Sequence, residues 1–278
     1  MIKDGLASAV HWSGLGRLVL SGADLTGLRV PVLLYHGVAE RPGPDQAGRA
    51  AFAAQMAYLS QRYTVVPLSL AVEAVRAGHK GPTDWAVVTF DDGYRNLLAN
   101  AFPVLQEHRI PATVFAVPGF AGAQAVWSSA DPESRRLLGW GEMQELSRAG
   151  LEFGSHTLTH ADLLNLPPAT VRAELAASKD ALEQRLGVPV RDLAYPWCRF
   201  DERTVDIARE VGYTSACAGG WWMHHLLRRL MTMKRVPVYP GDSLEVFRRK
   251  LEGAYCYMNI GATSRDRRRA PPAAGNAE

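Results

Sequence analysis

Short runs of apolar and β-branched residues alternate with helix-length amphipathic segments from residue 31 onward. This alternation predicts β-α units around a parallel sheet. Strands are expected at residues 31–35, 63–66, 86–90, 112–117, 151–155, 192–195 and 213–217. Helices are expected near residues 50–61, 69–77, 94–108, 142–149, 169–186, 201–211 and 243–253. Seven strands with helical crossovers favour a closed barrel over an open sheet.

A chain of 278 residues with 47% hydrophobic content can bury one large core, and α/β barrels of this length are commonly a single domain. We expect a catalytic domain over residues 31–256. Residues 1–30 have weak periodicity and are expected to form an N-terminal extension. Residues 257–278 have little to bury and are expected to form a disordered basic tail.

One long connection, residues 119–140, joins an expected strand to an expected helix. Long loops in compact domains are often functional. Because this loop leaves the C-terminal end of a strand, we expect it to form part of a substrate rim.

Charge and cysteine content exclude several classes of protein. The formal net charge of +3 comes without a basic patch interleaved with aromatic residues, so nucleic acid is not an expected partner. The cysteines, Cys198, Cys217 and Cys256, form no C-x-x-C pair and are odd in number, which argues against a disulfide framework or a thiolate zinc site. No signal peptide or membrane span is recognised. A cytoplasmic location is expected, with peripheral attachment to a membrane or a complex as the alternative.

Groups with metal-site or acid/base chemistry follow several of the expected strands. Asp91 and Asp92 follow 86–90, His156 and His160 follow 151–155, and His36 follows 31–35. In a closed parallel sheet all strand C-termini open on one face. These carboxylates and imidazoles are therefore expected to converge there.

Each of these pairs has a plainer interpretation as well. The spacing of His156 and His160 allows both imidazoles to reach one ion, although surface or core histidines often share it. Asp91 and Asp92 would serve equally as a turn or helix-capping residue. Adjacent carboxylates repel each other unless a cation lies beside them, which favours a His/His/Asp metal triad with the other Asp free as a base.

Thr-Phe-Asp-Asp-Gly at residues 89–93 and Ser-His-Thr-Leu-Thr-His at 155–160 resemble two motifs of the polysaccharide deacetylase family, also called the NodB-homology or carbohydrate esterase 4 group. The resemblance implies a distorted (β/α)7 barrel, hydrolysis of carbon–nitrogen bonds and a divalent metal, most often zinc. It also implies that Asp91 is the general base and that Asp92, His156 and His160 hold the metal.

The family's third motif departs from its usual form, R-P-P-Y-G, because Ala194 stands where the arginine is usual and Cys198 where a glycine is common. An aromatic-Pro-aromatic stretch here resembles the branch that acts on poly-N-acetylglucosamine and related exopolysaccharides. The resemblance implies that Tyr195, Pro196 and Trp197 line the substrate site, with an oxyanion donor in the backbone near Trp197. Packing alone is the alternative for the aromatic pair.

The family's last motif, Leu-x-His, is missing from its usual place near the C-terminus. Leu34-Tyr35-His36 offers it at the end of the first strand instead, which resembles a circular permutation known in the exopolysaccharide branch. His36 is therefore the expected general acid. A role as a simple rim residue stays open for it, with His224 or His225 as replacements.

The reaction predicted from these residues is removal of N-acetyl groups from an N-acetylhexosamine-containing glycan of exopolysaccharide or cell-wall type. Asp91 would take a proton from water and His36 would protonate the departing amine. One alternative substrate is a lipid-linked sugar, a peptidoglycan fragment or a small amide. Another alternative is a catalytically silent glycan-binding protein of a polysaccharide locus. The expected partners are the acetylated glycan and, peripherally, a membrane or a polysaccharide-synthesis complex.

Overall fold

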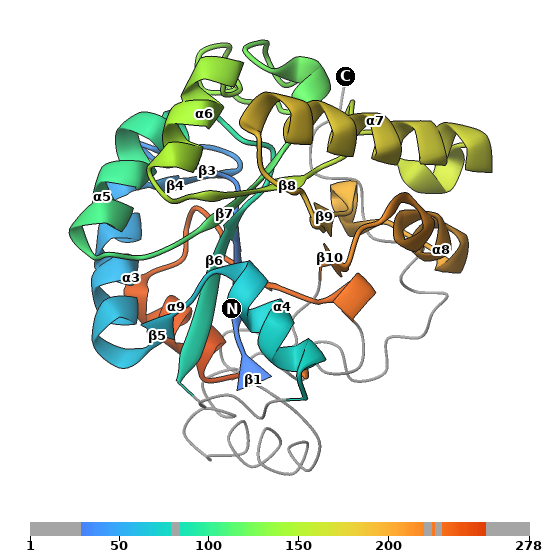
Figure 1. Cartoon of the computed structure of the whole chain (residues 1–278). Helices are drawn as coiled ribbons and strands as arrows, with labels where there is room; N and C mark the ends of the chain where they lie inside the picture. Colours follow the sequence, from blue (N-terminus) through green and yellow to red (C-terminus); the bar gives the residue numbers. More distant parts are fainter. Residues whose placement is uncertain (1–28, 79–83, 220–223, 226–229, 254–278) are drawn as a thin grey trace.

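The computed structural model describes residues 29–78, 84–219, 224–225 and 230–253 (Figure 1). Apart from its last two residues, the extension predicted over 1–30 lies outside this part of the chain. The predicted tail over 257–278 and Cys256 lie wholly outside it.

A curved parallel sheet forms the centre of the molecule. Its strands follow the order β10-β9-β8-β7-β6-β2-β12, and β5 pairs with the beginning of β6. The strands are β2 Val32–Tyr35, β5 Thr64–Val65, β6 Trp85–Phe90, β7 Thr113–Ala116, β8 Glu152–Ser155, β9 Asp192–Ala194, β10 Ser215–Cys217 and β12 Val236–Pro237. All neighbours in this order are parallel.

The segment before β12 joins the two ends of this order. Met233 forms a parallel bridge with Cys217 at the end of β10, and its N–H donates to the carbonyl of Ala216 at 2.9 Å. Three residues later, Val236 pairs with Leu33 of β2. The sheet therefore curls into the barrel that the sequence predicted.

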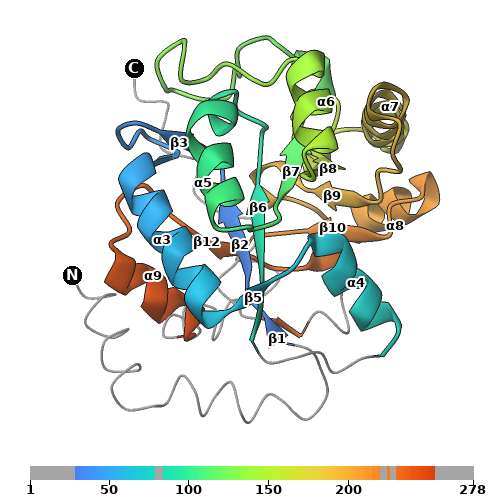
Figure 2. The same ribbon diagram turned by 60° about the vertical axis from the view of Figure 1, so that its left-hand side comes forward.

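Helices α3, α5 and α6 lie side by side along the outer side of the strands (Figure 2), and α7 and α8 continue this layer in Figure 1. The helices are α3 Arg49–Arg62, α4 Leu68–Arg76, α5 Phe102–Glu107, α6 Trp140–Arg148, α7 Pro168–Leu186, α8 Glu202–Val211 and α9 Leu244–Leu251. Each lies within a predicted helix or extends past it by only a residue or two. Gly187 ends α7 in a left-handed conformation with φ 70°, as expected of a helix C-cap.

One predicted helix is shorter than expected. The sequence predicted a helix over 94–108, but the observed helix begins with a π-helical turn, Leu97–Ala101, before α5. Tyr94 instead forms an antiparallel bridge with Leu137 and donates its hydroxyl to Asp45 at 2.8 Å. These long-range contacts outweigh the local helical preference, which a sequence pattern alone does not reveal.

The sequence did not predict several short pairings. β3 Gly37–Ala39 pairs with β4 Gln46–Gly48, and β1 Arg29–Val30 pairs with β11 His224–His225. β12 was also missed. Each of these strands has only two or three residues, too few to show a period.

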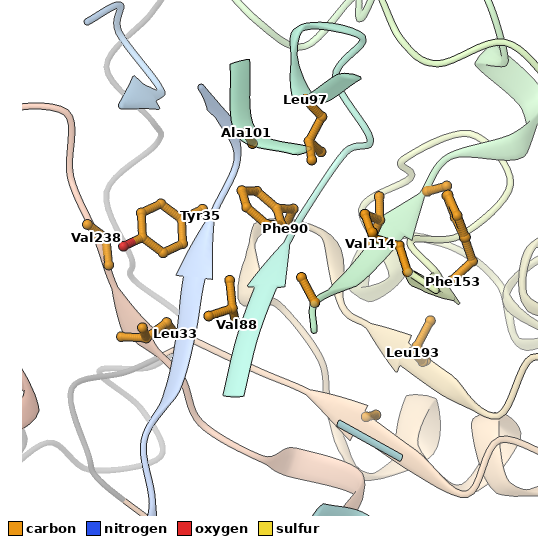
Figure 3. Packing of buried hydrophobic residues seen from close by; sticks show 14 of the residues in the cluster. Leu33, Tyr35, Val88, Phe90, Leu97, Ala101, Val114, Phe153, Leu193 and Val238 are labelled. Atoms are coloured by element: carbon orange, nitrogen blue, oxygen red, sulfur yellow. The ribbon is translucent and has the colours of Figure 1, made fainter. Parts of the chain in front are cut away.

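Alternate residues along the strands face opposite sides of the sheet. One set, which includes Tyr35, Phe90, Val114, Phe153 and Leu193, packs in the buried layer shared with the helices (Figure 3). The other set faces the barrel interior. At the N-terminal ends of the strands, α4 packs against it in a second apolar cluster that contains Val32, Val87, Phe115, Ala194 and Cys217. Polar interior positions are therefore left to the opposite end of the barrel.

Within the part of the chain that the structure describes, no helix combines the length and the apolar character that crossing a bilayer requires.

Candidate active site

The inward-facing positions of β6 change from apolar to polar along the strand. Val87 contributes to the interior apolar cluster, Thr89 donates its hydroxyl to the Leu33 carbonyl at 2.6 Å, and Asp91 follows directly after the strand. The N–H of Asp91 donates to the Tyr35 carbonyl of β2 at 2.9 Å, which continues the ladder. Asp91 is only 3% exposed, so the barrel holds a carboxylate at a fixed, buried position.

Left-handed backbone conformations occur at two of the candidate site residues and at the residue that follows a third, His156. Asp92 has φ 67°, Thr157 has φ 63° and His160 has φ 59°. This region costs an L-residue about 1–2 kcal/mol, and a β-branched residue such as Thr157 is rarely found there. Such strain persists only where surrounding contacts impose it and is common at functional sites.

The backbone conformation brings Asp92, His156 and His160 together. One ligand atom from each lies within 4.8 Å of the others, and all three residues are buried. The Asp92 carboxylate oxygen Oδ1 lies 3.3 Å from His160 Nε2 and 3.6 Å from His156 Nε2. A carboxylate and two imidazoles are the donor set of many catalytic zinc sites. These residues therefore fit a divalent metal.

A backbone carbonyl orients His156. Its Nδ1 lies 2.7 Å from the carbonyl oxygen of Ala194, and since a carbonyl only accepts, Nδ1 carries the proton. Nε2 is then free to bind a metal, an arrangement usual for metal-binding histidines. Burial, opposed in part by the charge of Asp91, lowers the pKa of His156 to about 4. The imidazole is therefore neutral at neutral pH, as a ligand must be.

His160 is held differently. Among the described residues its Nδ1 is buried without a hydrogen-bond partner. The indole of Trp127 stacks on its ring with centroids 4.2 Å apart and planes 6° apart. Trp197 approaches the same ring edge-on at 4.7 Å. Aromatic contacts thus fix the plane of this imidazole.

Arg235, just before β12, forms a bidentate ion pair with Asp91. Its Nη1 and Nη2 each donate to a different Asp91 carboxylate oxygen at 2.6 Å. The guanidinium is fully buried, donates also to Thr89 at 3.1 Å and lies over the Phe115 ring at 5.5 Å. Burial favours the neutral acid, but the charge of Arg235 and then of His156 lower the pKa of Asp91 below its usual value. Asp91 therefore stays ionised.

Sequence reasoning missed Arg235. One signal could have indicated it. Ala194 stands where the related motif usually has an arginine, so a buried carboxylate at Asp91 would need a cation from elsewhere in the chain. Ala194 is fully buried and lies in the interior apolar cluster. The guanidinium comes instead from the opposite edge of the strand order, where β12 is too short to be recognised from its pattern.

His36 lies beside Asp91 in the sheet. β2 pairs in parallel with β6, and Tyr35 is the register partner of Phe90, so His36 and Asp91 follow paired residues. The alternation that turns Val32 inward also turns His36 inward. A positive charge at His36 contributes to lowering the pKa of both Asp91 and Asp92, after larger contributions from Arg235 and His160 respectively. The first strand therefore lies beside the strand that leads to Asp91.

The backbone of His224 and His225 lies at the other end of β2. These residues pair with Val30 and Arg29, which precede the strand, whereas His36 follows it. They are therefore poor replacements for His36.

The predicted substrate residues behave differently from one another. Tyr195 is fully buried, donates its hydroxyl to the Met231 carbonyl at 3.1 Å and stacks on Phe200 at 4.8 Å. Pro196 is also buried. Both residues pack in the protein, whereas Trp197 is 40% exposed. A substrate role for these three residues stays a prediction.

The turn that carries Trp197 holds Cys198 in a left-handed backbone conformation. Trp197 and Cys198 have φ 57° and φ 55°, a conformation in which glycine is usual. Cys198 packs so closely on Gly219 that an added Cβ there would lie 2.4 Å from its sulfur. Burial raises the pKa of the Cys198 thiol to about 11. It is a free, protonated thiol with a packing role.

The sequence model of the polysaccharide deacetylase family matches residues 78–216, which is half of the chain. The chain belongs to the polysaccharide deacetylase family. The predictions of the family, of a hydrolase acting on carbon–nitrogen bonds and of a NodB-type barrel are thereby confirmed.

Individual relatives agree with this assignment. The protein YxkH of Bacillus subtilis is 26% identical over 230 residues, which cover 82% of this chain and 76% of YxkH. A poly-β-1,6-N-acetyl-D-glucosamine N-deacetylase of Staphylococcus aureus is 25% identical over 134 residues, covering 45% of this chain and 44% of its own. The structure of the Streptococcus pyogenes deacetylase PplD in complex with acetate matches with a TM-score of 0.72 and 21% identity, covering 81% of this chain and 99% of PplD.

The family match divides the site of this deacetylase into two parts. Asp91, Asp92, His156 and His160 lie inside it, whereas His36 and Arg235 lie in the flanking segments. The fold brings both flanking segments to β6 through β2 and β12.

Proposed function

We propose that this protein is a metal-dependent deacetylase that removes N-acetyl groups from an N-acetylhexosamine-containing glycan. The observation that carries the proposal is the difference between two neighbouring carboxylates. Asp92 belongs to the group of potential ligands with His156 and His160. Asp91 stands beside that group in a bidentate ion pair with Arg235. Asp92 can therefore bind a metal, while Asp91 can accept a proton.

Asp92, His156 and His160 would hold the metal, and zinc suits this mixed oxygen and nitrogen donor set. A bound divalent ion polarises an amide carbonyl and makes water more acidic. All three ligands are buried, which strengthens their electrostatic interactions.

Asp91 is the proposed general base. It takes a proton from the water that attacks the acetyl carbonyl carbon. Arg235 keeps it ionised and holds both its oxygens in place, so the carboxylate needs no reorganisation before it accepts the proton. His156 Nε2 lies 3.9 Å from Asp91 Oδ2, so the proposed base is next to a proposed metal ligand.

His36 is the proposed general acid. An amine anion is too basic to leave unaided, so His36 gives a proton to the nitrogen as the carbon–nitrogen bond breaks. The products are acetate and a free amino sugar. Asp91 then releases its proton to solvent, and His36 takes up a proton from solvent to replace the one it lost.

The oxyanion of the tetrahedral intermediate would accept a hydrogen bond from the Trp197 backbone. The N–H groups of Tyr195, Cys198 and Arg199 already donate to the carbonyls of Cys217, Tyr195 and Pro196. Because Pro196 has no N–H, Trp197 carries the remaining amide of this turn. Its half-exposed indole offers a face to the sugar ring.

The substrate class follows from the resemblance of residues 193–198 to the exopolysaccharide branch and from the name of the Staphylococcus aureus relative, a poly-β-1,6-N-acetyl-D-glucosamine N-deacetylase. An acetylated exopolysaccharide is therefore the first substrate to test. Contact with a polysaccharide-synthesis complex or a membrane surface, and a cytoplasmic location, stay predictions.

The experiment is incubation of zinc-reconstituted protein with β-1,6-linked N-acetylglucosamine oligomers, with detection of acetate and of a mass loss matching one acetyl group. Parallel arms contain a peptidoglycan fragment, a lipid-linked N-acetyl sugar and a small acetamide. Acetate from the oligomers supports the proposal. Turnover of only the lipid-linked sugar or the small amide would contradict the glycan assignment, and no turnover in any arm would favour a glycan-binding protein.

A further inference from the structure

The two metal-site histidines differ in what orients them. His156 donates a hydrogen bond from Nδ1 to the Ala194 carbonyl. His160 has a buried Nδ1 with no partner among the residues that the structure describes. A metal-binding histidine normally relies on such a partner to fix its ring, so another feature must set the orientation of His160.

Trp127 contacts two members of the triad at once. Its indole stacks nearly parallel to the His160 ring, with centroids 4.2 Å apart and an angle of 6° between the ring planes. Its Nε1–H also donates to Asp92 Oδ1 at 3.2 Å. Stacking restricts rotation of the imidazole, while the hydrogen bond fixes one carboxylate oxygen.

The loop around Trp127 is tied to its surroundings. Phe120 packs edge-on against the indole, with centroids 5.4 Å apart. Next to Trp127, Ser128 donates to Asp45 Oδ2 at 3.1 Å. These contacts hold the indole from both sides of the loop.

The same loop is docked on the segment that carries the histidines. The Gly119 N–H donates to the Leu158 carbonyl at 2.9 Å. A Cβ on Gly119 would lie 2.4 Å from that carbonyl oxygen, so only glycine permits this approach. The loop position is therefore defined relative to His160 itself.

We propose that Trp127 is a positioning residue for the metal, which orients His160 by stacking and Asp92 by hydrogen bonding and thereby raises metal affinity. It takes the place of the hydrogen-bond partner that Nδ1 of His160 lacks among the described residues. This inference rests on the metal site of the proposed function.

The test is metal affinity measured without any substrate. Stripped protein is titrated with Zn²⁺ in competition with a fluorescent chelator. Trp127→Phe keeps a stacking ring and removes the donor, whereas Trp127→Leu removes both. Trp140→Phe is the matched control, since Trp140 begins α6 and lies against the Arg185 guanidinium at 5.4 Å. Loss of an outer-shell partner typically weakens metal binding by about 10–100-fold.

We expect roughly tenfold weaker Zn²⁺ binding for Trp127→Phe and roughly a hundredfold for Trp127→Leu, with Trp140→Phe unchanged. The thermal midpoint of metal-free Trp127→Phe should equal that of the wild type. In the Co²⁺-loaded protein the visible absorption bands should shift for the Trp127 variants only, because the ligand geometry has changed.

Wild-type affinity in both Trp127 variants would overturn the inference and leave the metal site intact. A wild-type protein that binds neither Zn²⁺ nor Co²⁺ would overturn the metal site itself and the inference with it. Trp127→Phe alone decides the outcome if Trp127→Leu does not fold.

Discussion

The two sides of the site are built in different ways. The strand side, comprising Asp91, His156 and Arg235, lies at strand ends and is fixed by charged or backbone hydrogen bonds of 2.6 to 2.7 Å. The loop side, comprising His160, Trp127 and Trp197, is fixed mainly by aromatic rings. The exposed fraction of the residue surface differs as well, from 0% at Arg235 on the strand side to 40% at Trp197 on the loop side.

The difference matches the demands on each side. Proton transfer requires a base held at one place and in one ionisation state, which a buried guanidinium and a sheet provide. Substrate binding requires an apolar surface that solvent can reach, which loop aromatics provide. Changes to Asp91 or Arg235 should therefore impair turnover while the metal is kept. Changes on the loop side, like a change to the proposed ligand His156, should impair metal or substrate affinity.

Removing the guanidinium should have the largest effect. Arg235→Met leaves Asp91 buried without its partner, which should lower the free energy of unfolding by about 3–5 kcal/mol and turnover by ~10³-fold. Because Arg235 lowers the pKa of Asp91, the variant should need a higher pH to ionise its base. The acid limb of the pH–rate profile should therefore move to higher pH.

Denaturant unfolding and pH–rate profiles test this prediction for Arg235→Met, and Arg235→Lys is the control variant that keeps a positive charge. An unshifted limb would mean that Arg235 is only structural.

His36→Ala tests whether the strand side also holds the acid. Deacetylation of an N-acetyl sugar should fall by ~10²-fold and the alkaline limb of its pH–rate profile should disappear. Metal content should stay constant. Hydrolysis of 4-nitrophenyl acetate should be largely retained, since nitrophenolate leaves without protonation. Equal losses on both substrates would remove His36 from the role of acid.

Trp197→Ala tests the exposed part of the loop side. The indole offers the substrate a face but makes only an edge contact with His160, so kcat/KM should fall about tenfold, mainly through KM. Bound metal, measured by elemental analysis, should not change. Loss of metal instead would mean that this ring also positions the ligands.

The smallest effect on turnover is expected for a buried carboxylate that is not part of the proposed site. Asp192 begins β9, accepts a hydrogen bond from Ser215 at 2.5 Å, and burial raises its pKa to about 6. Because the folded-state pKa is raised, its contribution to stability is present at low pH and is lost as pH rises from about 4 to 6. Asp192→Asn should abolish this dependence and stabilise the protein at pH 7 by about 1–3 kcal/mol, with unchanged turnover. Urea unfolding across this pH range is the measurement, and an unaltered pH dependence would contradict it.

On each side of the site the sequence predicted two residues and missed one. Period-2 patterns mark β2, β6 and β8, and the residues after parallel strands share one face, so Asp91, Asp92, His36 and His156 could be brought together in advance. Trp127 could not, because its position depends on the loop contacts of Gly119 and Ser128, which have no sequence period. Arg235 was missed because β12 has only two residues. The burial of Tyr195 was not predicted, because the outward turn at Trp197 depends on a left-handed conformation that the pattern does not encode.

The most direct test of the account compares two isosteric substitutions at adjacent positions, Asp91→Asn and Asp92→Asn, by measuring bound metal and acetate release on the same preparations. The account predicts that Asp91→Asn keeps the metal and loses at least ~10²-fold in turnover, whereas Asp92→Asn loses the metal and, with it, the turnover. Near wild-type acetate release from Asp91→Asn, or full metal content in Asp92→Asn, would contradict the division of roles between the two carboxylates.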